Sequence, residues 1–359
     1  MLLKSVFLKN FRCFTAYQIA LESPFILLSG KNGSGKTSVI EALHYACYLT
    51  SFRTHQPKDM IAFGEETCFI KIEGISEEYD WTIQAGFDKK KRSIKVNNTA
   101  ATSYKDLIDT YRVISIMEDD LQFIHGSPDY RRQLINQLLI LLDPSLYSVL
   151  KKYRTILEQR NAALESGMQD PILYDVWTMQ LWELTKTLHE HRIHLIDKLQ
   201  LIMQDFVGCF FDDRYLFSLH YITKRYKITS SYNNFLEENK ALLQQERLYK
   251  RSLFGAHLDD ITLLFHDKIS KQFASRGQQK LLVVLLKLAH HKIINKSSLI
   301  LVDDFITDFD DTTIALLLQL FTSLKSQLII TTPSLSKAES IIKTYNPLQI
   351  NLSNTSHGN

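Results

Sequence analysis

The pattern of apolar and polar residues changes character twice along the chain. Over residues 1–118, and again over 247–359, short continuous or alternating apolar runs predict β-strands with helices between them. In the middle, over 119–246, the apolar residues recur at helical spacing. This order favours one α/β domain that is assembled from both ends of the chain and carries an inserted helical lobe. The predicted strands cover residues 2–11, 25–29, 69–72, 81–83, 93–96, 298–302 and 327–331.

The strands between residues 69 and 96 are joined by tight polar turns, which favours a small antiparallel sheet. One helix is predicted after the strand at 25–29 and the loop that follows it. Glu41 and His44 lie off the apolar face of this helix. Ser127 followed by Pro128 is a typical helix start, with a serine cap before a proline in the first helical position. Further helices are predicted over 144–164, 172–206 and 312–324. A leucine-rich helix follows residues 273–280 and ends at about residue 294.

The strand at 25–29 continues into a glycine-rich loop and then a helix. The loop has the complete pattern G-x-x-x-x-G-K-T of a nucleotide phosphate-binding loop. Its glycines let backbone N–H groups form a nest for anionic oxygens, to which the helix adds its positive end. Lys36 is expected to reach the β- and γ-phosphates of ATP, and the Thr37 hydroxyl to hold Mg²⁺. The predicted ATP site comprises Gly30, Lys31, Asn32, Gly33, Ser34, Gly35, Lys36 and Thr37.

Two aspartates follow the apolar strand at 298–302. Asp303, at the end of a buried strand, is placed to hold Mg²⁺ opposite Thr37. Asp304 is expected to polarise the attacking water and, with Lys36, forms the predicted catalytic pair. Two carboxylates after a strand also occur as a simple strand exit, but the intact phosphate loop favours the catalytic interpretation.

Another candidate phosphate-binding segment precedes the leucine-rich helix that ends near residue 294. Ser275, Arg276, Gly277 and Gln278 resemble the signature loop of ABC-type ATPases, where a serine and a glycine stand at a helix start. In that superfamily this loop reaches the γ-phosphate held by the other subunit. The alternative is a plain N-cap, which Ser275 would also make. Asp308 and Asp310 lie where such ATPases have their D-loop.

Composition and charge narrow the function classes only slightly. The chain has 359 residues and a formal net charge of +3, so any DNA-binding surface has to be a local patch. The four cysteines are scattered without a C-x-x-C pair, which predicts reduced thiols and a cytosolic protein. Apolar runs are too short for a membrane span, and the chain starts without a secretory signal. The basic run at 89–92 is interpreted as a hairpin tip, and His189, His191 and His194 as a solvated helix face.

Several segments together resemble the RecF family of bacterial DNA recombination and repair ATPases, over nearly the whole chain. The resemblance implies an ABC-type ATPase head, with a P-loop domain, an antiparallel β subdomain and an inserted helical lobe, and it adds Arg12 to the ATP site. It further implies DNA binding, ATP-dependent homodimerisation, slow hydrolysis, and work with RecO and RecR to load RecA at gaps, in the bacterial cytoplasm at the nucleoid. The matching segments are 9–12, 30–37, 51–54, 126–128, 131–132, 142–144, 159–161, 255–260, 273–280 and 303–304.

The chain departs from the family pattern at four positions. Ala256 and Leu258 stand where a proline and an arginine are usual, so one cation is lost. Arg276 replaces a glutamine of the signature loop, and Glu118 replaces a proline. These changes remove no phosphate or Mg²⁺ ligand, but they bear on DNA contacts and on the rate of hydrolysis.

Two related functions remain as alternatives. An ATP-hydrolysing subunit of an ABC transporter would have a much shorter spacing between the phosphate loop and the signature loop. An SMC-like chromosome-organising head would carry a long coiled coil, whereas the helical lobe contains Pro128, Pro144 and Pro171 and no sustained heptads. Candidates for a DNA-facing surface on the lobe are Arg131, Arg132, Lys151, Lys152, Arg154 and Arg160.

Overall fold

The computed structural model divides into two compact units. Unit 1 comprises Met1–Leu121, Gly208–Asp212 and Arg276–Asn359, and unit 2 comprises Gln122–Val207 and Asp213–Ser275. The described residues are 1–54, 56–76, 79–88, 92–101, 107, 111–167, 170–211, 216–224, 226–229, 231–294, 298–304, 309–333 and 337–352. The basic turn at 89–91 and the aspartate at 308 lie outside them.

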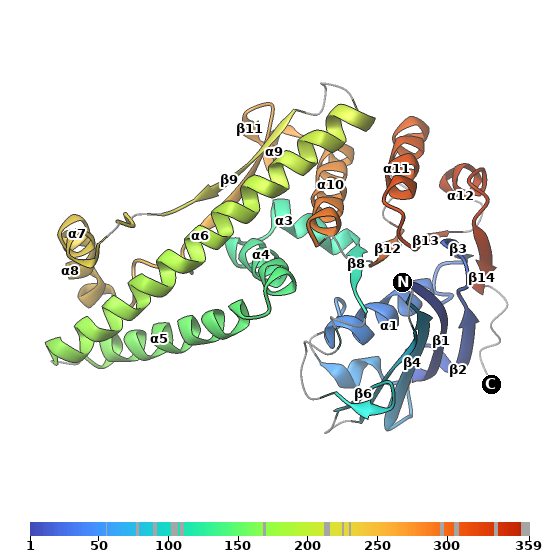
Figure 1. Cartoon of the computed structure of the whole chain (residues 1–359), viewed down its shortest axis with the longest axis horizontal. Helices are drawn as coiled ribbons and strands as arrows, with labels where there is room; N and C mark the ends of the chain where they lie inside the picture. Colours follow the sequence, from blue (N-terminus) through green and yellow to red (C-terminus); the bar gives the residue numbers. More distant parts are fainter. Residues whose placement is uncertain are drawn as a thin grey trace. The chain divides into compact units, whose positions relative to one another are not determined.

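A parallel sheet forms the centre of unit 1 (Figure 1). Every residue of β3 and of β8 is buried, as expected for parallel strands covered on both faces. The strands predicted at 25–29, 298–302 and 327–331 are confirmed within a residue or two, as β3, β12 and β13. Within the described residues, the strand order is β14 (Leu348–Asn351), β3 (Phe25–Gly30), β13 (Leu328–Pro333), β12 (Leu299–Asp303), β8 (Val113–Ile116).

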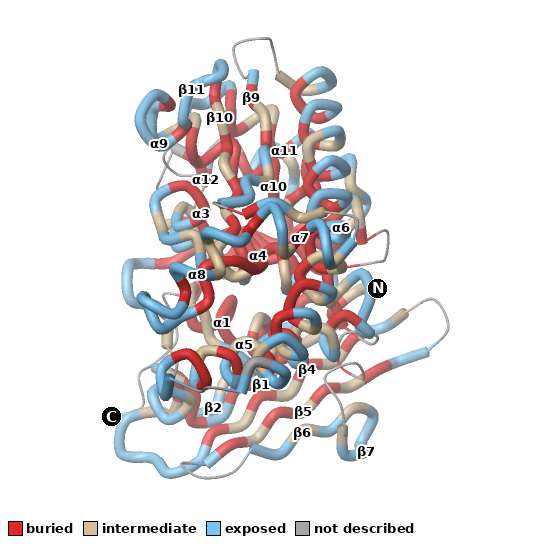
Figure 2. The backbone as a smooth tube through the Cα atoms, turned by 90° about the vertical axis from the view of Figure 1, so that its left-hand side faces the viewer, coloured by how far each residue is buried: buried red, intermediate tan, exposed pale blue. Residues whose placement is uncertain are grey.

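An antiparallel sheet makes up the rest of the strand structure of unit 1. The predicted first strand is confirmed at Leu2–Phe11, and the predicted antiparallel sheet is present. Buried residues alternate with partly exposed ones along β4 and β5, which gives the alternating colours of these strands in Figure 2. The order is β2 (Phe14–Ala20), β1 (Leu2–Phe11), β4 (Thr67–Ile75), β5 (Asp80–Asp88), β6 (Arg92–Val96), β7 (Thr99–Ala100).

Helix α1 (Lys36–Tyr48) contacts strands of both sheets and is buried on nearly all sides. The prediction placed Glu41 and His44 off the apolar face of this helix, but Glu41 is buried and His44 is partly buried. Glu41 is 0% exposed, and the ring Nδ1 of His44 lies 2.7 Å from the Ser115 hydroxyl. Burial lowers the pKa of His44 to about 3. The other helices of unit 1 are η1 (Pro57–Met60), η2 (Glu118–Leu121), α10 (Arg276–Ile294), α11 (Asp311–Ser323) and α12 (Lys337–Lys343).

Unit 2 is mainly helical and also contains a small antiparallel sheet, ordered β11-β10-β9 (Figure 1). Pro128 is the first residue of α4, as predicted, but the Ser127 side chain makes no capping hydrogen bond. The elements of unit 2 are α3 (Gln122–His125), α4 (Pro128–Leu142), α5 (Leu146–Ser166), α6 (Pro171–Phe210), β9 (Phe217–Ile222), α7 (Tyr232–Glu238), α8 (Lys240–Tyr249), β10 (Asp260–Phe265), β11 (Lys268–Ile269) and α9 (Ser270–Phe273).

The pairing of β10 with β9 decides where the second unit ends. Ile261 pairs with Tyr221 and Phe265 with Phe217, so the stretch up to Ser275 belongs to unit 2. The compact units thus divide the chain between 275 and 276, whereas the predicted lobe ends at 246. In both divisions one unit is built from the two ends of the chain.

Three of the arginines proposed for a DNA-facing surface are used inside unit 2, so their assignment to that surface is wrong. Arg131 forms a bidentate pair with Asp260 at 2.7 and 3.1 Å. Arg132 donates to the backbone carbonyl of Asp259 and to the carboxylate of Asp129. Arg160 is 0% exposed and pairs with Glu246, which is also 0% exposed. These guanidinium groups hold the fold together, which leaves Lys151, Lys152 and Arg154 exposed.

The buried carboxylate of Asp259 organises a second polar cluster. It accepts hydrogen bonds from His189 Nε2 at 2.6 Å and from the hydroxyls of Tyr221 at 2.5 Å and Tyr226 at 2.6 Å. His189 is buried, so the prediction of a solvated histidine face holds for His191 and His194 but is wrong for His189.

Two negative findings concern the described residues. No group of three or more histidine, cysteine or acidic side chains there could hold a metal ion, and no described helix is long and apolar enough to cross a bilayer. The four cysteines are free, as predicted, with Cys47 and Cys68 buried.

The Arg160–Glu246 pair provides a test of the packing of unit 2. We expect Glu246→Gln to lower the free energy of unfolding by about 3–5 kcal/mol, because the Arg160 charge would remain buried without a counter-charge. Urea unfolding followed by circular dichroism measures this loss. The control is Glu238→Gln, which breaks the exposed Lys227–Glu238 pair and should cost less than about 1 kcal/mol. Equal losses in both variants would show that the buried pair is not a structural element.

Candidate nucleotide site

The phosphate-binding loop joins the end of β3 to the start of α1 in unit 1. Gly33 and Gly35 have φ values of 84° and 96°, in the left-handed region that other residues rarely adopt. Gly35 is also the N-cap of α1, where a Cβ would lie 2.5 Å from Cζ of Phe14. Both backbone conformation and space therefore require glycine at position 35. The loop delivers the start of α1, with the first N–H groups of the helix, to the predicted phosphate position.

Two side chains of the loop are arranged as partners for an anion. The Ser34 hydroxyl is buried and makes no hydrogen bond with any described residue. Lys36 is only 4% exposed, and its Nζ donates to the carbonyl oxygens of Gly30 at 3.1 Å and Lys31 at 3.3 Å. A phosphate group would give the buried hydroxyl a partner and the buried ammonium a counter-charge, so these residues fit a nucleotide triphosphate.

The parallel register brings the predicted Mg²⁺ ligands to the same edge of the sheet. Asp303 at the end of β12 is paired with Thr331 of β13, and β13 pairs in turn with β3, which leads into the loop. Oδ1 of Asp303 accepts hydrogen bonds from the Thr37 hydroxyl at 3.2 Å and the Thr331 hydroxyl at 2.7 Å. One carboxylate and one hydroxyl thus meet beside the loop, and these hard oxygen donors suit Mg²⁺.

Asp304 follows with a φ of 47°, and its backbone N–H donates to the Thr331 hydroxyl at 2.9 Å. Burial raises the pKa of both Asp303 and Asp304, so each ionised carboxylate costs free energy in the folded chain. A bound divalent cation would offset that cost. The buried carboxylates therefore fit a cation site better than a solvated strand exit.

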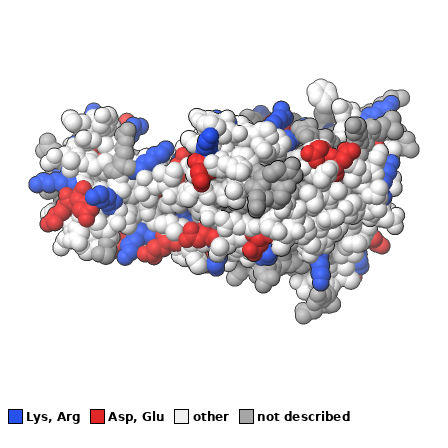
Figure 3. All heavy atoms as spheres, turned by 90° about the horizontal axis from the view of Figure 1, so that it is seen from above, with Lys and Arg blue, Asp and Glu red and all other residues white. Residues whose placement is uncertain are grey.

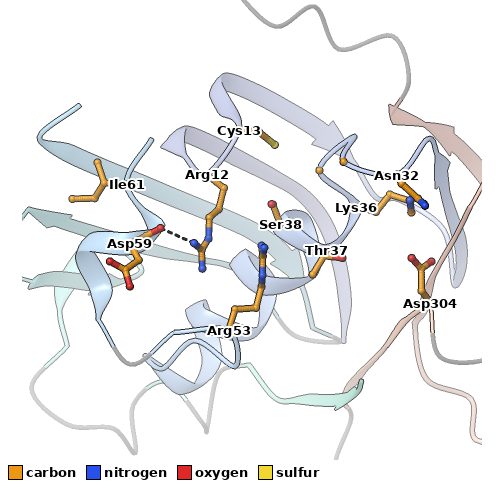
Figure 4. A pocket seen from close by; sticks show the side chains of 12 residues that line it. Arg12, Cys13, Asn32, Lys36, Thr37, Ser38, Arg53, Asp59, Ile61 and Asp304 are labelled. Carbon is orange, nitrogen blue, oxygen red and sulfur yellow. Dashed lines mark hydrogen bonds between the residues drawn. The ribbon is translucent and has the colours of Figure 1, made fainter. Parts of the chain in front are cut away.

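Arg12 lies at this site because a buried carboxylate of α1 holds it there. Its Nε and Nη2 donate to Glu41 at 2.8 and 2.5 Å, and its Nη1 donates to the carbonyl of Asp59 at 2.6 Å, drawn as the dashed line in Figure 4. Arg53 Nη1 lies 3.3 Å from the same carboxylate, and the Ser51 hydroxyl donates to it at 2.5 Å. Glu41 thus orients two cations at the edge of the phosphate loop.

These residues surround a cavity of about 710 Å³, large enough for a nucleotide. In Figure 4, the Lys36 and Thr37 side chains lie between the arginines and the carboxylate of Asp304. The described residues that line the cavity all belong to unit 1. They are Arg12, Cys13, Asn32, Gly33, Gly35, Lys36, Thr37, Ser38, Arg53, Asp59, Ile61 and Asp304.

The signature loop does not line this cavity. Ser275 is exposed and directly precedes α10, which begins at Arg276. A Cβ built on Gly277 meets no atom within 4 Å, so the space beside the first turn of α10 is open. The predicted contact of this loop with ATP in trans stays a prediction.

Two departures from the family pattern are partners of each other. Arg276 Nη2 donates to Glu118 Oε1 at 2.7 Å, and Lys280 Nζ lies 2.6 Å from Glu118 Oε2. Lys280 is almost fully buried, whereas the Arg276 side chain is 71% exposed. Glu118 therefore compensates the charge that Arg276 adds to the signature loop.

Asp310 of the predicted D-loop caps α11. Its carboxylate accepts the backbone N–H of Thr313 at 2.7 Å. Helix capping alone is therefore enough to account for an acidic residue at position 310. The role of Asp310 in a D-loop stays a prediction.

The structure thus assembles the predicted loop residues, Arg12, Asp303 and Asp304, and it adds three residues that the prediction missed. Glu41 and Arg53 position the Arg12 side of the cavity, and Thr331 links the two aspartates. A signal for Glu41 was present, because it lies four residues after Thr37 on the same helix face.

Comparisons with known proteins identify the family of this chain. A family model described as the RecF/RecN/SMC N terminal domain matches residues 2–350. The DNA replication and repair protein RecF of Streptococcus gordonii is 30% identical over 373 aligned residues that cover 100% of this chain and 99% of that protein. The DNA replication and repair protein RecF of Thermosynechococcus vestitus is 29% identical, in an alignment that covers 86% of this chain and 85% of that protein.

Solved structures show the same fold. A structure of the recombination mediator protein RecF with ATP in the RecFOR pathway has a TM-score of 0.80, with 22% identity over 94% of this chain and 93% of that chain. An Smc head domain of Pyrococcus furiosus with an extended coiled coil has a TM-score of 0.54, with 16% identity over 98% of this chain and 93% of that chain.

Lys36 tests the location of the site. We expect Lys36→Ala to weaken ATP binding at least about 100-fold, because the ammonium is the main positive charge for the β- and γ-phosphates. Titration with a fluorescent ATP analogue measures the affinity, and circular dichroism confirms the fold. The matched control is Lys58→Ala, an exposed lysine of the same unit that does not line the cavity. Unchanged affinity in a folded Lys36→Ala chain would place the nucleotide elsewhere.

Proposed function

This chain belongs to the RecF family of DNA replication and repair proteins, and we propose that it is an ATP-gated clamp on DNA. In this proposal the chain binds Mg²⁺ and ATP, closes on a second copy of itself at DNA, and hydrolyses ATP slowly to open again. The observation that carries the proposal is the meeting of Lys36, Thr37 and Asp303 at one edge of the parallel sheet.

Binding of ATP follows from the chemistry of the loop. The N–H groups at the start of α1 and the Lys36 ammonium neutralise the phosphate oxygens, and the Ser34 hydroxyl gains a partner. Thr37 and Asp303 would hold Mg²⁺, which when bound would supply a Lewis acid for the phosphate oxygens. Arg12 and Arg53, held by Glu41, add positive charge at the rim of the cavity.

Hydrolysis is assigned to Asp304. Its carboxylate lines the cavity, and its backbone N–H is fixed by Thr331. Burial raises the pKa of Asp304, which makes its carboxylate a stronger proton acceptor for the attacking water. Slow hydrolysis is consistent with a clamp, because hydrolysis serves to open the closed dimer and not to produce ADP at a high rate.

Closure in trans is the second part of the proposal. The signature loop has open space beside Gly277 and does not reach the cavity of its own chain. In a two-fold dimer, Ser275, Gly277 and Gln278 of each copy would complete the γ-phosphate site of the other. ATP would then hold the two copies together.

DNA binding is supported by the family relationship and not by overall charge. Figure 3 shows Lys and Arg interspersed with Asp and Glu on the visible face, without a continuous basic surface. In this proposal, contacts with DNA are made by local patches and depend on ATP. We further propose cooperation with RecO- and RecR-like proteins in loading RecA at single-strand gaps, in the cytoplasm at the nucleoid, since RecF relatives are named as replication and repair proteins.

The transporter alternative is distinguished from the proposed clamp by what stimulates the ATPase. A transporter subunit or an SMC-like head would use the same nucleotide chemistry. Stimulation by DNA supports the proposed clamp, whereas stimulation by vesicles that carry membrane protein would support a transporter subunit.

Replacement of Asp304 should separate binding from hydrolysis. We expect Asp304→Asn to bind ATP normally but to hydrolyse it about 100-fold more slowly, and so to prolong the closed dimer and DNA binding. Phosphate release and sedimentation velocity provide the measurements. Asp311→Asn, an exposed acid of the same unit, is the control. Hydrolysis at the wild-type rate in Asp304→Asn would remove Asp304 from the mechanism.

Mixed dimers test closure in trans. Ser275→Arg should retain ATP binding by the monomer but lose ATP-dependent dimerisation. When it is mixed with Lys36→Ala, half of the random dimers carry one intact composite site, so about a quarter of the wild-type hydrolysis should return. A Ser275→Arg chain that dimerises normally, or no recovery in the mixture, would limit Ser275 to a helix cap.

A further inference from the structure

A second cavity lies within unit 2, and the residues that line it differ from those of the nucleotide site. It has a volume of about 380 Å³ and is formed by α4, α5, α6 and the loop that carries His257 (Figure 1 shows these helices). Four cations line it, against a single carboxylate. The cations are Arg132, Lys151, Arg154 and Arg192, and the carboxylate is that of Asp129.

The inner wall of this cavity is rigid and its charges are already compensated. Arg192 donates to the carbonyl of Ala256 at 2.7 Å and to Asn136 Oδ1 at 3.0 Å, and lies 3.7 Å from Asp259. Arg132 is neutralised by Asp129. The ring Nδ1 of His257 lies 2.8 Å from the Tyr153 hydroxyl, and burial lowers the pKa of His257 to about 4, so the ring is neutral at pH 7. The wall fixes the shape of the cavity without adding net charge.

The outer rim has a different character. Tyr147, Lys151 and Arg154 stand on α5 at i, i+4 and i+7, so they follow one face of the helix. Lys151 and Arg154 are exposed and form no ion pair with a described residue, in contrast to Arg132 and Arg192 of the same cavity. The Tyr147 ring is 60% exposed although it borders a cavity. Two uncompensated cations therefore follow an exposed aromatic ring along the rim.

We propose that this cavity binds one nucleotide of a DNA single strand, with its base against Tyr147 and its phosphate at Lys151 and Arg154. The inference rests on the proposed function, in that the chain binds DNA, and it names the part of the DNA that this site takes. Bases stack on exposed aromatic rings irrespective of sequence, and neighbouring cations follow the phosphate backbone.

The size of the cavity and the exposed aromatic ring favour a DNA single strand over a duplex. A cavity of about 380 Å³ admits one nucleotide but not a duplex. In a duplex the faces of the bases are covered by their neighbours in the stack, so an aromatic ring can reach only an unpaired base. An acidic peptide would satisfy Lys151 and Arg154, but it does not account for the exposed tyrosine.

The test measures DNA binding by the full-length chain with ATP and Mg²⁺, using labelled oligo-dT and a duplex of equal length across a salt series. We expect Tyr147→Ala to weaken oligo-dT binding about tenfold with an unchanged salt slope and unchanged duplex affinity. The double variant Lys151→Ala/Arg154→Ala should reduce the salt slope for oligo-dT by about 0.7, since it removes the contact with one phosphate and each phosphate contributes about 0.7 for a single strand. Lys152→Ala, on another face of α5 and outside the cavity lining, should leave both affinities close to the wild type.

Each outcome decides a separate question. A wild-type chain that binds neither DNA contradicts the proposed function, and this inference with it. A chain that binds DNA with the same affinity in Tyr147→Ala and in the double variant overturns only this inference. Polyglutamate serves as a probe for an acidic protein. If the double variant Lys151→Ala/Arg154→Ala loses polyglutamate binding but keeps oligo-dT binding, the cavity binds an acidic protein and not DNA. Because the three substituted side chains are exposed, thermal unfolding should confirm that the variants remain folded.

Discussion

The nucleotide site depends on the parallel pairing of three strands. β3 leads into the phosphate loop, β13 supplies Thr331, and β12 ends at Asp303, and their register places all three ends at one edge. A shift of one residue in β12 would turn Asp303 to the other face of the sheet and separate it from Thr37. Because these strands come from opposite ends of the chain, the site exists only when both ends are folded together. ATP binding and completion of unit 1 are therefore coupled.

Unit 2 uses its charged residues differently. Its adjacent carboxylates, Asp259 and Asp260, accept hydrogen bonds from arginine, tyrosine and histidine side chains of the same unit. Breaking such a pair leaves a buried charge, so these contacts hold the helices and the β9–β10 sheet in one arrangement. Charges that are satisfied internally are not available to a partner. These buried arginines are therefore not part of the proposed DNA contact, which leaves exposed cations such as Lys151 and Arg154 for it.

Local chemistry could be predicted from the sequence, and long-range pairing could not. The phosphate loop is contiguous, and its glycines and lysine occupy positions that chemistry demands, so the site was predictable together with β3, β12 and β13. Arg131, Arg160 and His189 have the spacing of ordinary solvated helix residues, and only their partners Asp260, Glu246 and Asp259, far along the chain, show that they are buried. Glu41 was misassigned for the same reason, because Arg12 and Arg53 reach it from other elements. The end of the second unit depended on the β9–β10 pairing, which periodicity does not contain.

The central claim is that ATP controls DNA binding by joining two copies of the chain. It is tested most directly by the salt dependence of DNA affinity, measured with a non-hydrolysable ATP analogue and without nucleotide. The account predicts a higher affinity and a steeper slope with the analogue, because two copies then engage more phosphates than one. Identical affinities and identical slopes in the two conditions would contradict it.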